Sequence, residues 1–228
     1  MDRVLVHSPN QIDLLQRRLG FSREQLHLVP YGIDTEYWAP GPRVEEADLV
    51  LSTGREHRDH RTLVDAVGGT ARLFVTDSSA HSPRARRRGP QEWPEWVERR
   101  SLSHLDLRER YDRAAVVVVP LLPTSYPFGI TSLLEAMAMA KPVVVTDTEG
   151  LRGIVEHGRT GLLVPPGDGA ALRRAVRGLL EDTDTREDLG QAARAAVIGR
   201  FGLDHFVDEL GRHLDEVAGR SRTPEHWS

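Results

Sequence analysis

The sequence predicts an α/β protein built on a doubly wound parallel β-sheet, and three observations lead to this fold class. Short apolar runs recur along the chain, each about as long as one strand. These runs are continuously apolar rather than alternating, which is typical of strands that are covered on both faces. Segments with helical spacing of apolar residues lie between them, and this alternation indicates β-α-β units. The predicted strands are 3–8, 25–29, 48–53, 71–76, 114–120, 141–146 and 160–164.

The predicted helices complete this pattern. Four of them alternate with the strands, and three follow one another at the C-terminal end. The first of the last three opens with Asp168 after Pro-Pro-Gly, which is typical of a helix N-cap after a breaker. The predicted ranges are 11–19, 60–67, 105–114 and 131–140, followed by 168–181, 185–199 and 203–218.

The composition excludes several classes of protein. The 228 residues are 39% hydrophobic and 28% charged, which suffices for one large domain or two small ones with a packed core. The chain has no cysteine, so disulfide scaffolds, thiolate metal sites and cysteine nucleophiles are excluded. No apolar run reaches the roughly 18 residues of a membrane span, and Met1 is not followed by a secretory leader. We therefore expect a cytoplasmic protein without a transmembrane segment.

The charge distribution gives no reason to expect a nucleic-acid partner, because the net charge is −4. One basic cluster, residues 84–88, lies in a stretch rich in Ser, Pro and Arg at 77–95. We interpret this stretch as an exposed loop within the domain. A basic cluster in such a loop indicates a solvated tip more often than a nucleic-acid or membrane surface.

The loop after the third predicted strand is the first candidate site. Ligands of doubly wound folds bind beyond the carboxyl ends of the strands, where this loop lies. Gly54 lets the backbone approach an anion, while Arg55 and Arg58 carry planar guanidinium groups suited to phosphate oxygens. A turn with solvated charges is equally compatible with the spacing. A metal site on the histidines of this loop needs more ligands than the stretch provides, so we predict no metal.

The second candidate site is the start of the helix predicted over 131–140. Backbone N–H groups at a helix start point outward without partners, beside the positive end of the helix dipole, and so form an anion site. Glu135 lies about one turn into the helix, where its carboxylate accepts hydrogen bonds from donors such as sugar hydroxyls. Alternatively, Glu135 only complements the helix dipole. The residues of this helix start are Gly129, Ile130, Thr131 and Ser132.

Four further blocks of the sequence bear on function: 28–40, 54–63, 129–147 and 157–168. They resemble consecutive blocks of the GT-B glycosyltransferases of family 4, the glycosyl transferases group 1. They come in that family's order and spacing. The resemblance implies the C-terminal, Rossmann-like half of a GT-B enzyme of carbohydrate biosynthesis. Such a half binds a nucleotide sugar, commonly UDP- or GDP-linked, and the enzyme transfers the sugar with retention of configuration and without a bound metal or other cofactor.

The resemblance also implies roles for individual residues. Arg55 and Arg58 match the cations that hold the donor diphosphate, so they are the expected catalytic residues, although Arg58 stands where lysine is usual. Glu135 matches the second glutamate of the family's Glu-x7-Glu motif, which binds the ribose hydroxyls. Residues 129–132 match the helix start that receives the phosphates, and with Gly54 they complete the expected nucleotide-sugar site.

Two positions depart from the family pattern. Pro127 stands where the first glutamate of the motif is expected, and the neighbouring Tyr126 is not acidic either. Because that glutamate approaches the donor sugar in the family, the sugar contacts should differ here. Ala140 occupies a position where glycine is usual, and a positive φ at this position would strain an alanine.

The resemblance divides the chain into three parts: 1–25 as the end of an N-terminal acceptor domain, 26–200 as the nucleotide-sugar-binding domain, and 201–228 as a crossover helix and tail. The expected partners are a nucleotide-sugar donor and an acceptor-binding domain that is missing or separately encoded, or a second copy through the last helix. Two other functions stay open. One is a non-catalytic nucleotide-sugar-binding subunit of a split transferase, and the other is a GT-B-like epimerase or phosphorylase.

Overall fold

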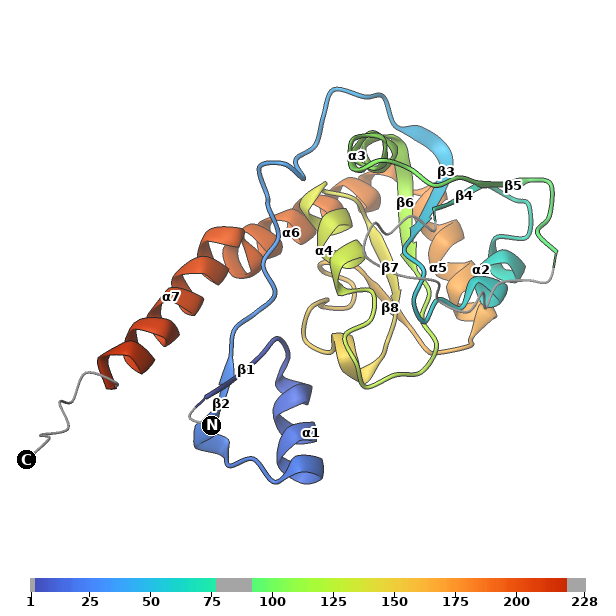
Figure 1. The fold of residues 1–228 in the computed structure, drawn as a ribbon. Helices are drawn as coiled ribbons and strands as arrows, with labels where there is room; N and C mark the ends of the chain where they lie inside the picture. Colours follow the sequence, from blue (N-terminus) through green and yellow to red (C-terminus); the bar gives the residue numbers. More distant parts are fainter. Residues whose placement is uncertain (1–2, 77–91, 221–228) are drawn as a thin grey trace, which may run out of the picture.

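The computed structural model describes residues 3–76 and 92–220, and Figure 1 shows their arrangement. Most of the loop expected at 77–95 lies outside the described residues, including the whole basic cluster at 84–88. The described chain forms a large α/β unit around a six-stranded sheet and a small unit with a two-stranded sheet beside the last helix.

The six-stranded sheet has the doubly wound topology that the sequence predicts. All neighbouring strands pair in parallel, in the order β5-β4-β3-β6-β7-β8. The chain moves outward from β3 in one direction, crosses back, and continues from β6 in the other direction. The strands are β3 Glu46–Thr53, β4 Arg72–Thr76, β5 Val97–Arg99, β6 Ala114–Val119, β7 Val143–Thr146 and β8 Leu162–Val164.

Edge strand β5 is the strand of this sheet that the sequence pattern does not predict. It has three residues, and only Val97 is both apolar and buried. One buried residue followed by two charged ones carries no periodic signal. Its place is set by parallel pairing with β4, in which Val97 lies opposite Leu73.

Helices cover both faces of the large sheet, as expected for a doubly wound fold (Figure 1). One face packs against α2 His60–Val67 and α5 Gly169–Glu181. The other packs against α3 His104–Arg113, α4 Ile130–Ala138 and α6 Thr183–Phe201. None of the helices in the described residues combines the length and the apolar character needed to cross a membrane.

Strand β6 shows why the central strands are continuously apolar. Val116 and Val118 pack with residues of α2 and α5, whereas Val117 and Val119 pack with residues of α3, α4 and α6. All four side chains are fully buried. Burial of each valine contributes roughly 1.5–3 kcal/mol relative to exposure, so a run of valines strongly favours the central position in the sheet.

The small unit consists of two parallel strands and one helix. Its core is formed by Val6, Ile12 and Leu26. Because β2 pairs with β1, residues 26–28 belong to the small sheet. The division of the chain into three parts at residues 25 and 200 stays a prediction. The elements are β1 Val4–Val6, α1 Pro9–Leu19, the 3-10 turn η1 Arg23–Gln25 and β2 Leu26–Leu28.

Helix α7, Leu203–Arg220, follows α6 and extends away from the large sheet along the small unit (Figure 1). One side of α7 contacts the small unit, where Arg3 donates a hydrogen bond to Nδ1 of His213 over 2.8 Å. Other apolar positions of the helix are exposed. A partner that covers them, either an acceptor-binding domain or a second copy of the chain, stays a prediction. The exposed apolar side chains of α7 are Leu203, Val207 and Leu214.

Candidate functional site

The candidate site lies where β3 and β6 meet, at the point where the strand order of the sheet reverses direction. Two loops leave the carboxyl ends of these strands, 54–59 after β3 and 120–129 after β6. Backbone hydrogen bonds join them: Asp59 N–H donates to the carbonyl of Pro120 over 3.0 Å, and Leu122 N–H donates to the carbonyl of His57 over 2.9 Å. This is the place at which doubly wound sheets bind ligands.

Arg58 fills the space between these two loops and the start of α4. Its side chain is only 4% exposed. Nε donates to the carbonyl of Thr53 over 2.9 Å, Nη1 donates to the carbonyl of Glu56 over 2.8 Å, and Nη2 donates to Oγ of Ser132 over 3.1 Å. These contacts use three of the five guanidinium N–H groups, and the other two make no hydrogen bond within the described residues.

Two glycines make room for this guanidinium. Gly54 has a φ of +89°, and a Cβ there would overlap Nη2 of Arg58. Gly129 has a φ of +83°, and a Cβ there would lie 3.2 Å from Nη1 and 3.0 Å from Cγ1 of Val119. Both glycines are therefore needed for a left-handed backbone and for the close approach of Arg58.

Arg58 places a fixed positive charge inside the site. Burial lowers the pKa of Arg58 to about 10, while the nearby Tyr111 and Glu135 act in the opposite direction. A pKa of about 10 leaves the guanidinium charged at neutral pH. The sequence left open a turn with solvated charges, whereas the structure shows the Arg58 guanidinium held beneath the loops by backbone carbonyls.

Arg55 is the more accessible of the two arginines. Arg55 is half-buried, and its guanidinium has no hydrogen bond or ion pair within residues 3–76 and 92–220. It follows Gly54 directly, whose N–H donates to the carbonyl of Thr76 over 3.1 Å. Arg55 is thus anchored at its backbone while its charge remains available to an anion.

The start of α4 provides unpaired backbone donors. Gly129 is the N-cap, and Ile130 N–H donates to the carbonyl of Pro127 over 3.2 Å. The N–H groups of Thr131 and Ser132 have no hydrogen-bond partner in the part of the chain that the structure describes. These donors, the helix dipole and the Arg58 guanidinium bound to Ser132 together produce positive potential at the start of α4.

Glu135 lies on the same helix but points inward. Its side chain is 9% exposed, and Oε2 accepts a hydrogen bond from the hydroxyl of Tyr111 over 3.0 Å. Burial raises the pKa of Glu135 to about 7, and Tyr111 and Arg58 oppose this rise. The position is therefore not a solvated helix face, which was the alternative left open by the sequence.

Tyr111 is a site residue that the sequence did not reveal. Its hydroxyl lies 2.9 Å from Oγ1 of Thr53 and 3.3 Å from the carbonyl of Ser132, and the side chain is fully buried. It therefore links the end of β3 to α4 beneath the loops. In the sequence, Tyr111 is one of the regularly spaced apolar positions of a predicted helix, so it looked like an ordinary core residue.

The histidines of the 54–59 loop region do not form a metal site. His57 has a φ of +54° and stacks on the ring of Phe128, with centroids 4.0 Å apart. His60 faces the ring of Trp93 at 5.4 Å, while Asp59 caps α2 by accepting from Thr62 N–H over 3.1 Å. Within the described residues, no group of three or more histidines and carboxylates is placed to hold a metal ion.

A sequence profile described as "Glycosyl transferases group 1" matches residues 58–182, which is more than half of the chain. The chain belongs to this family. The match begins at Arg58 and includes the whole of α4. It confirms the family that the four sequence blocks led us to expect.

Curated relatives match this group 1 chain over most of its length. D-inositol 3-phosphate glycosyltransferase of Kribbella flavida is 29% identical in an alignment of 223 positions that covers 84% of this chain and 51% of the relative. Alpha-maltose-1-phosphate synthase of Mycolicibacterium smegmatis is 28% identical in an alignment of 243 positions that covers 90% of this chain and 60% of the relative. The chain thus spans between half and three fifths of the length of these two relatives.

Solved structures confirm the fold of the group 1 chain as that of GT-B glycosyltransferases. Sucrose-phosphate synthase from Thermosynechococcus elongatus superposes with a TM-score of 0.80 at 26% identity, over 96% of this chain and 59% of that one. Anabaena HepE in complex with UDP superposes with a TM-score of 0.80 at 18% identity, over 94% of this chain and 64% of that one. The first is similar in sequence as well, and the second shows the fold alone.

Proposed function

We propose that this chain is the donor-binding half of a retaining glycosyltransferase of family 4, which transfers a sugar from a UDP- or GDP-linked donor. One juxtaposition carries the proposal: the buried charge of Arg58 contacts Ser132 at the helix start, where the N–H groups of Thr131 and Ser132 are unpaired among the described residues. Gly54, the residue before Arg55, lies against the same two side chains of Arg58 and Ser132. A diphosphate carries the negative charge and the acceptor oxygens that such a site recognises.

The diphosphate would be held by the helix start and Arg55, with Arg58 beneath it. Sugar transfer leaves negative charge on the departing diphosphate. Donors and positive charges that are already in place stabilise this charge in the transition state and need no reorganisation at that moment. Three hydrogen bonds hold the guanidinium of Arg58, so its positive charge cannot move away from the site.

Glu135 would receive the ribose of the nucleotide. Tyr111 occupies Oε2, and Oε1 has no hydrogen-bond partner among the described residues. A ribose hydroxyl that donates to Oε1 would favour the ionised carboxylate over the protonated one. Nucleotide binding should therefore be weaker when Glu135 is replaced by Gln, which keeps the shape but loses the charge.

A carboxylate that could act as general base is missing from the loop that leads into α4, where Pro127 and Tyr126 stand. In the front-face mechanism that the family resemblance implies, an oxygen of the leaving phosphate assists the incoming hydroxyl instead. We expect the acceptor to be positioned mainly by an acceptor-binding domain, so this chain by itself should bind nucleotide and transfer sugar poorly. Robust transfer by the purified monomer would contradict this expectation.

The same observation favours a second candidate function. A site that holds a diphosphate but offers no carboxylate toward the sugar is suited to a nucleotide-sugar-binding subunit without catalysis. The two functions differ in one measurement. An acceptor-binding domain that co-purifies with the chain is added. If the chain is the donor-binding half of a transferase, sugar transfer should begin; if it is a non-catalytic subunit, the nucleotide sugar should bind without transfer.

Nucleotide binding itself is tested by thermal unfolding with UDP, GDP, ADP and dTDP. A ligand at a hundred times its dissociation constant stabilises the folded state by about 2.7 kcal/mol, which raises the midpoint of a domain of this size by about 5–10 °C. Arg55→Ala should abolish the shift. Arg174→Ala, an exposed arginine on α5 at the other face of the sheet, is the matched control and should leave the shift unchanged. If none of the four nucleotides shifts the midpoint, the proposal is wrong.

A further inference from the structure

A cavity of about 340 Å³ lies between α3, the segment 41–43 and the end of α4. The α3 residues that line it stand at positions 105, 108, 109 and 112, which is the spacing of one helix face. Tyr111 lies on another face of α3, buried against the sheet, where it contacts Glu135. The cavity therefore shares no residue with the proposed donor site. Its lining residues are Gly41, Pro42, Arg43, Leu105, Arg108, Glu109, Asp112 and Met139.

The size and the apolar part of the lining suit a small molecule. Small-molecule sites usually measure about 300–1,000 Å³ and combine apolar walls with a few polar groups that fix the orientation of the ligand. Met139 is 1% exposed and Leu105 is 59% exposed, so the apolar lining extends from the core to the surface. Pro42 adds a third apolar side chain. A short apolar body can thus be removed from water in this cavity.

The wall formed by the segment 41–43 is fixed to α3 by Asp112. The buried carboxylate accepts hydrogen bonds from Gly41 N–H over 2.8 Å and from Arg43 N–H over 2.9 Å. A Cβ on Gly41 would lie 2.6 Å from Oδ2 of Asp112, so only glycine permits this close approach. The cavity is therefore already formed before a ligand enters.

Four charged side chains line the cavity, and three of them are compensated. The carboxylate of Asp112 has its two N–H donors, and Arg43 forms an ion pair with Glu109 at 2.9 Å. Arg108 forms no ion pair with any residue that the structure describes, and its one hydrogen bond runs from Nη2 to the carbonyl of Ala39 over 3.3 Å. The charge that remains uncompensated in the cavity is thus positive.

Arg108 also has donors without acceptors. Its Nε is buried and makes no hydrogen bond among the described residues, and neither does Nη1. The nearby ring of Tyr37, 5.8 Å from Cζ, leaves these donors unpaired. A buried donor without a partner is destabilising, so an oxygen supplied by a ligand is favoured beside it. The parallel N–H groups at the end of a guanidinium match the two oxygens of a carboxylate.

We propose that this cavity binds a small carboxylic acid with an apolar body. The carboxylate pairs with Arg108, and the apolar body packs on Leu105 and Met139. The charge of the ligand follows from the uncompensated guanidinium, and its apolar body follows from the side chains of the walls. The proposal does not depend on the proposed function, because no residue of the cavity belongs to the donor site.

The test is a titration of the full chain, labelled with nitrogen-15, in which the amide chemical shifts are measured. Three probes separate the two requirements: hexanoate has the apolar chain and the charge, 1-hexanol has the chain alone, and acetate has the charge alone. We expect hexanoate to shift the amide signals of Gly41 and Arg43 in the cavity wall and to bind at least about tenfold more tightly than the other two probes. No saturating shift with hexanoate, or equal binding of hexanoate and either other probe, would overturn the proposal.

Variants assign the binding to this cavity. Arg108→Gln should weaken hexanoate about tenfold, to the level of hexanol, because the charge is lost. Leu105→Gln changes an exposed position that takes no part in the contact between Arg108 and Ala39, and it should weaken hexanoate severalfold while acetate is unaffected. If Arg108→Gln does not fold, Leu105→Gln decides. Hexanoate binding as tight as that of the wild type in the folded variants would show that the cavity is not the site.

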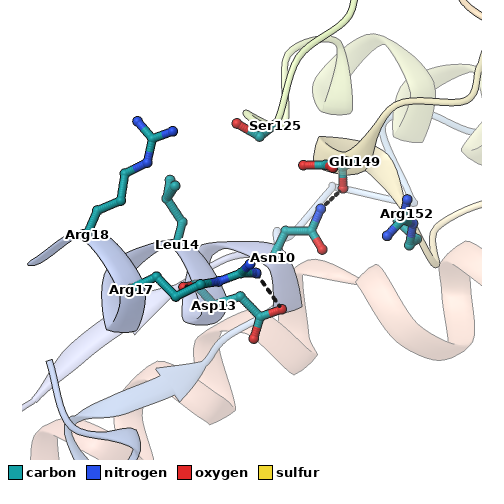
Figure 2. A pocket seen from close by; sticks show the side chains of 8 residues that line it. All are labelled: Asn10, Asp13, Leu14, Arg17, Arg18, Ser125, Glu149 and Arg152. Atoms are coloured by element: carbon teal, nitrogen blue, oxygen red, sulfur yellow. Dashed lines mark hydrogen bonds and ion pairs between the residues drawn. The ribbon is translucent and has the colours of Figure 1, made fainter. Parts of the chain in front are cut away.

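A second cavity can attract the same anionic probe, and Figure 2 shows it between α1 and the turn after β7. Its volume is about 250 Å³, and Arg18 and Arg152 in its lining make no hydrogen bond or ion pair with the described part of the chain. Leu14 is the one apolar residue among those that line it, so binding there should not depend on the hexanoate chain.

Two further variants exclude binding elsewhere. Replacing both Arg18 and Arg152 by Gln should leave hexanoate binding unchanged, and so should Arg55→Ala in the proposed donor site. Loss of hexanoate binding in either variant, together with normal binding in Arg108→Gln, would place the probe at another site and overturn the proposal.

Discussion

The hydroxyl of Tyr111 donates a hydrogen bond to Oε2 of Glu135 over 3.0 Å, with both side chains buried between the sheet and α4. Burial disfavours the ionised form of both groups: it raises the pKa of Glu135 to about 7 and that of Tyr111 well above 10. The pair therefore makes the stability of the fold depend on pH near neutrality.

The first prediction concerns this pH dependence. The pKa of Glu135 is higher in the folded protein than the usual 4.5, so the folded state holds a proton that the unfolded state releases. The stabilisation is fully present below about pH 4.5 and is lost as the pH rises through about 7. At about 1.4 kcal/mol per pKa unit, its size is up to roughly 3 kcal/mol. Urea unfolding between pH 5 and 8 measures it.

Glu135→Gln is the control for this prediction, because the amide does not titrate. The unfolding free energy of the wild type minus that of the variant should fall as the pH rises from 5 to 8. Other titrating groups, such as His27, contribute equally to both proteins and cancel in the difference. Parallel curves for the two proteins would contradict the raised pKa.

The second prediction concerns Tyr111→Phe. The variant keeps the ring in the core but removes the hydroxyl that Glu135 and Thr53 share, so we expect a loss of about 1–3 kcal/mol in unfolding free energy. Because the Tyr111 hydrogen bond lowers the pKa of Glu135, the pH transition should also move to higher pH. Tyr126→Phe is the matched control, since Tyr126 is 55% exposed, and should change stability by no more than about 0.5 kcal/mol.

The third prediction concerns Gly54→Ala. Gly54 has a φ of +89°, and the added Cβ would displace the guanidinium of Arg58. Gly153 has a similar φ of +83° but nothing within 4 Å of an added Cβ, so Gly153→Ala measures the backbone strain alone, about 1–2 kcal/mol. We expect Gly54→Ala to be less stable than Gly153→Ala and to lose the nucleotide-induced midpoint shift. A normal shift in the Gly54 variant would mean that the position of Arg58 is unimportant for binding.

The sequence predicted the framework of this fold because the framework depends on periodic burial. The valines of β6 are apolar on both faces, and the structure places that strand in the middle of the sheet between two layers of helices. The positions of the candidate site residues in the chain could also be predicted, since Gly54 and Gly129 each follow a strand and precede a helix.

The contacts within the site could not be predicted in the same way. Charged residues are usually exposed, so no sequence pattern indicated that Arg58 is buried against the carbonyls of Thr53 and Glu56. Tyr111 was indistinguishable from a core aromatic residue, because its hydrogen bond to Glu135 joins positions 24 residues apart. Such contacts depend on how α3 and α4 pack on the sheet, which no local pattern encodes.

The fourth prediction concerns Ala140, which has a φ of +53° where a left-handed conformation is required. This conformation costs an alanine about 1–2 kcal/mol, and glycine adopts it freely. Glycine also raises the entropy of the unfolded chain, which offsets about 0.4–1 kcal/mol of the gain. Ala140→Gly should therefore stabilise the protein by up to about 1 kcal/mol in urea unfolding.

A second alanine provides the control for the Ala140 prediction. Ala195 is exposed in the interior of α6, where glycine is less favourable than alanine, so Ala195→Gly should destabilise the protein by about 0.5–1 kcal/mol. The same substitution should thus have opposite signs at the two positions, because only one of them has a positive φ. Destabilisation by both variants would show that the turn after α4 does not strain Ala140. In that case alanine would be the better residue at this turn, in contrast to the glycine that is usual there in the family.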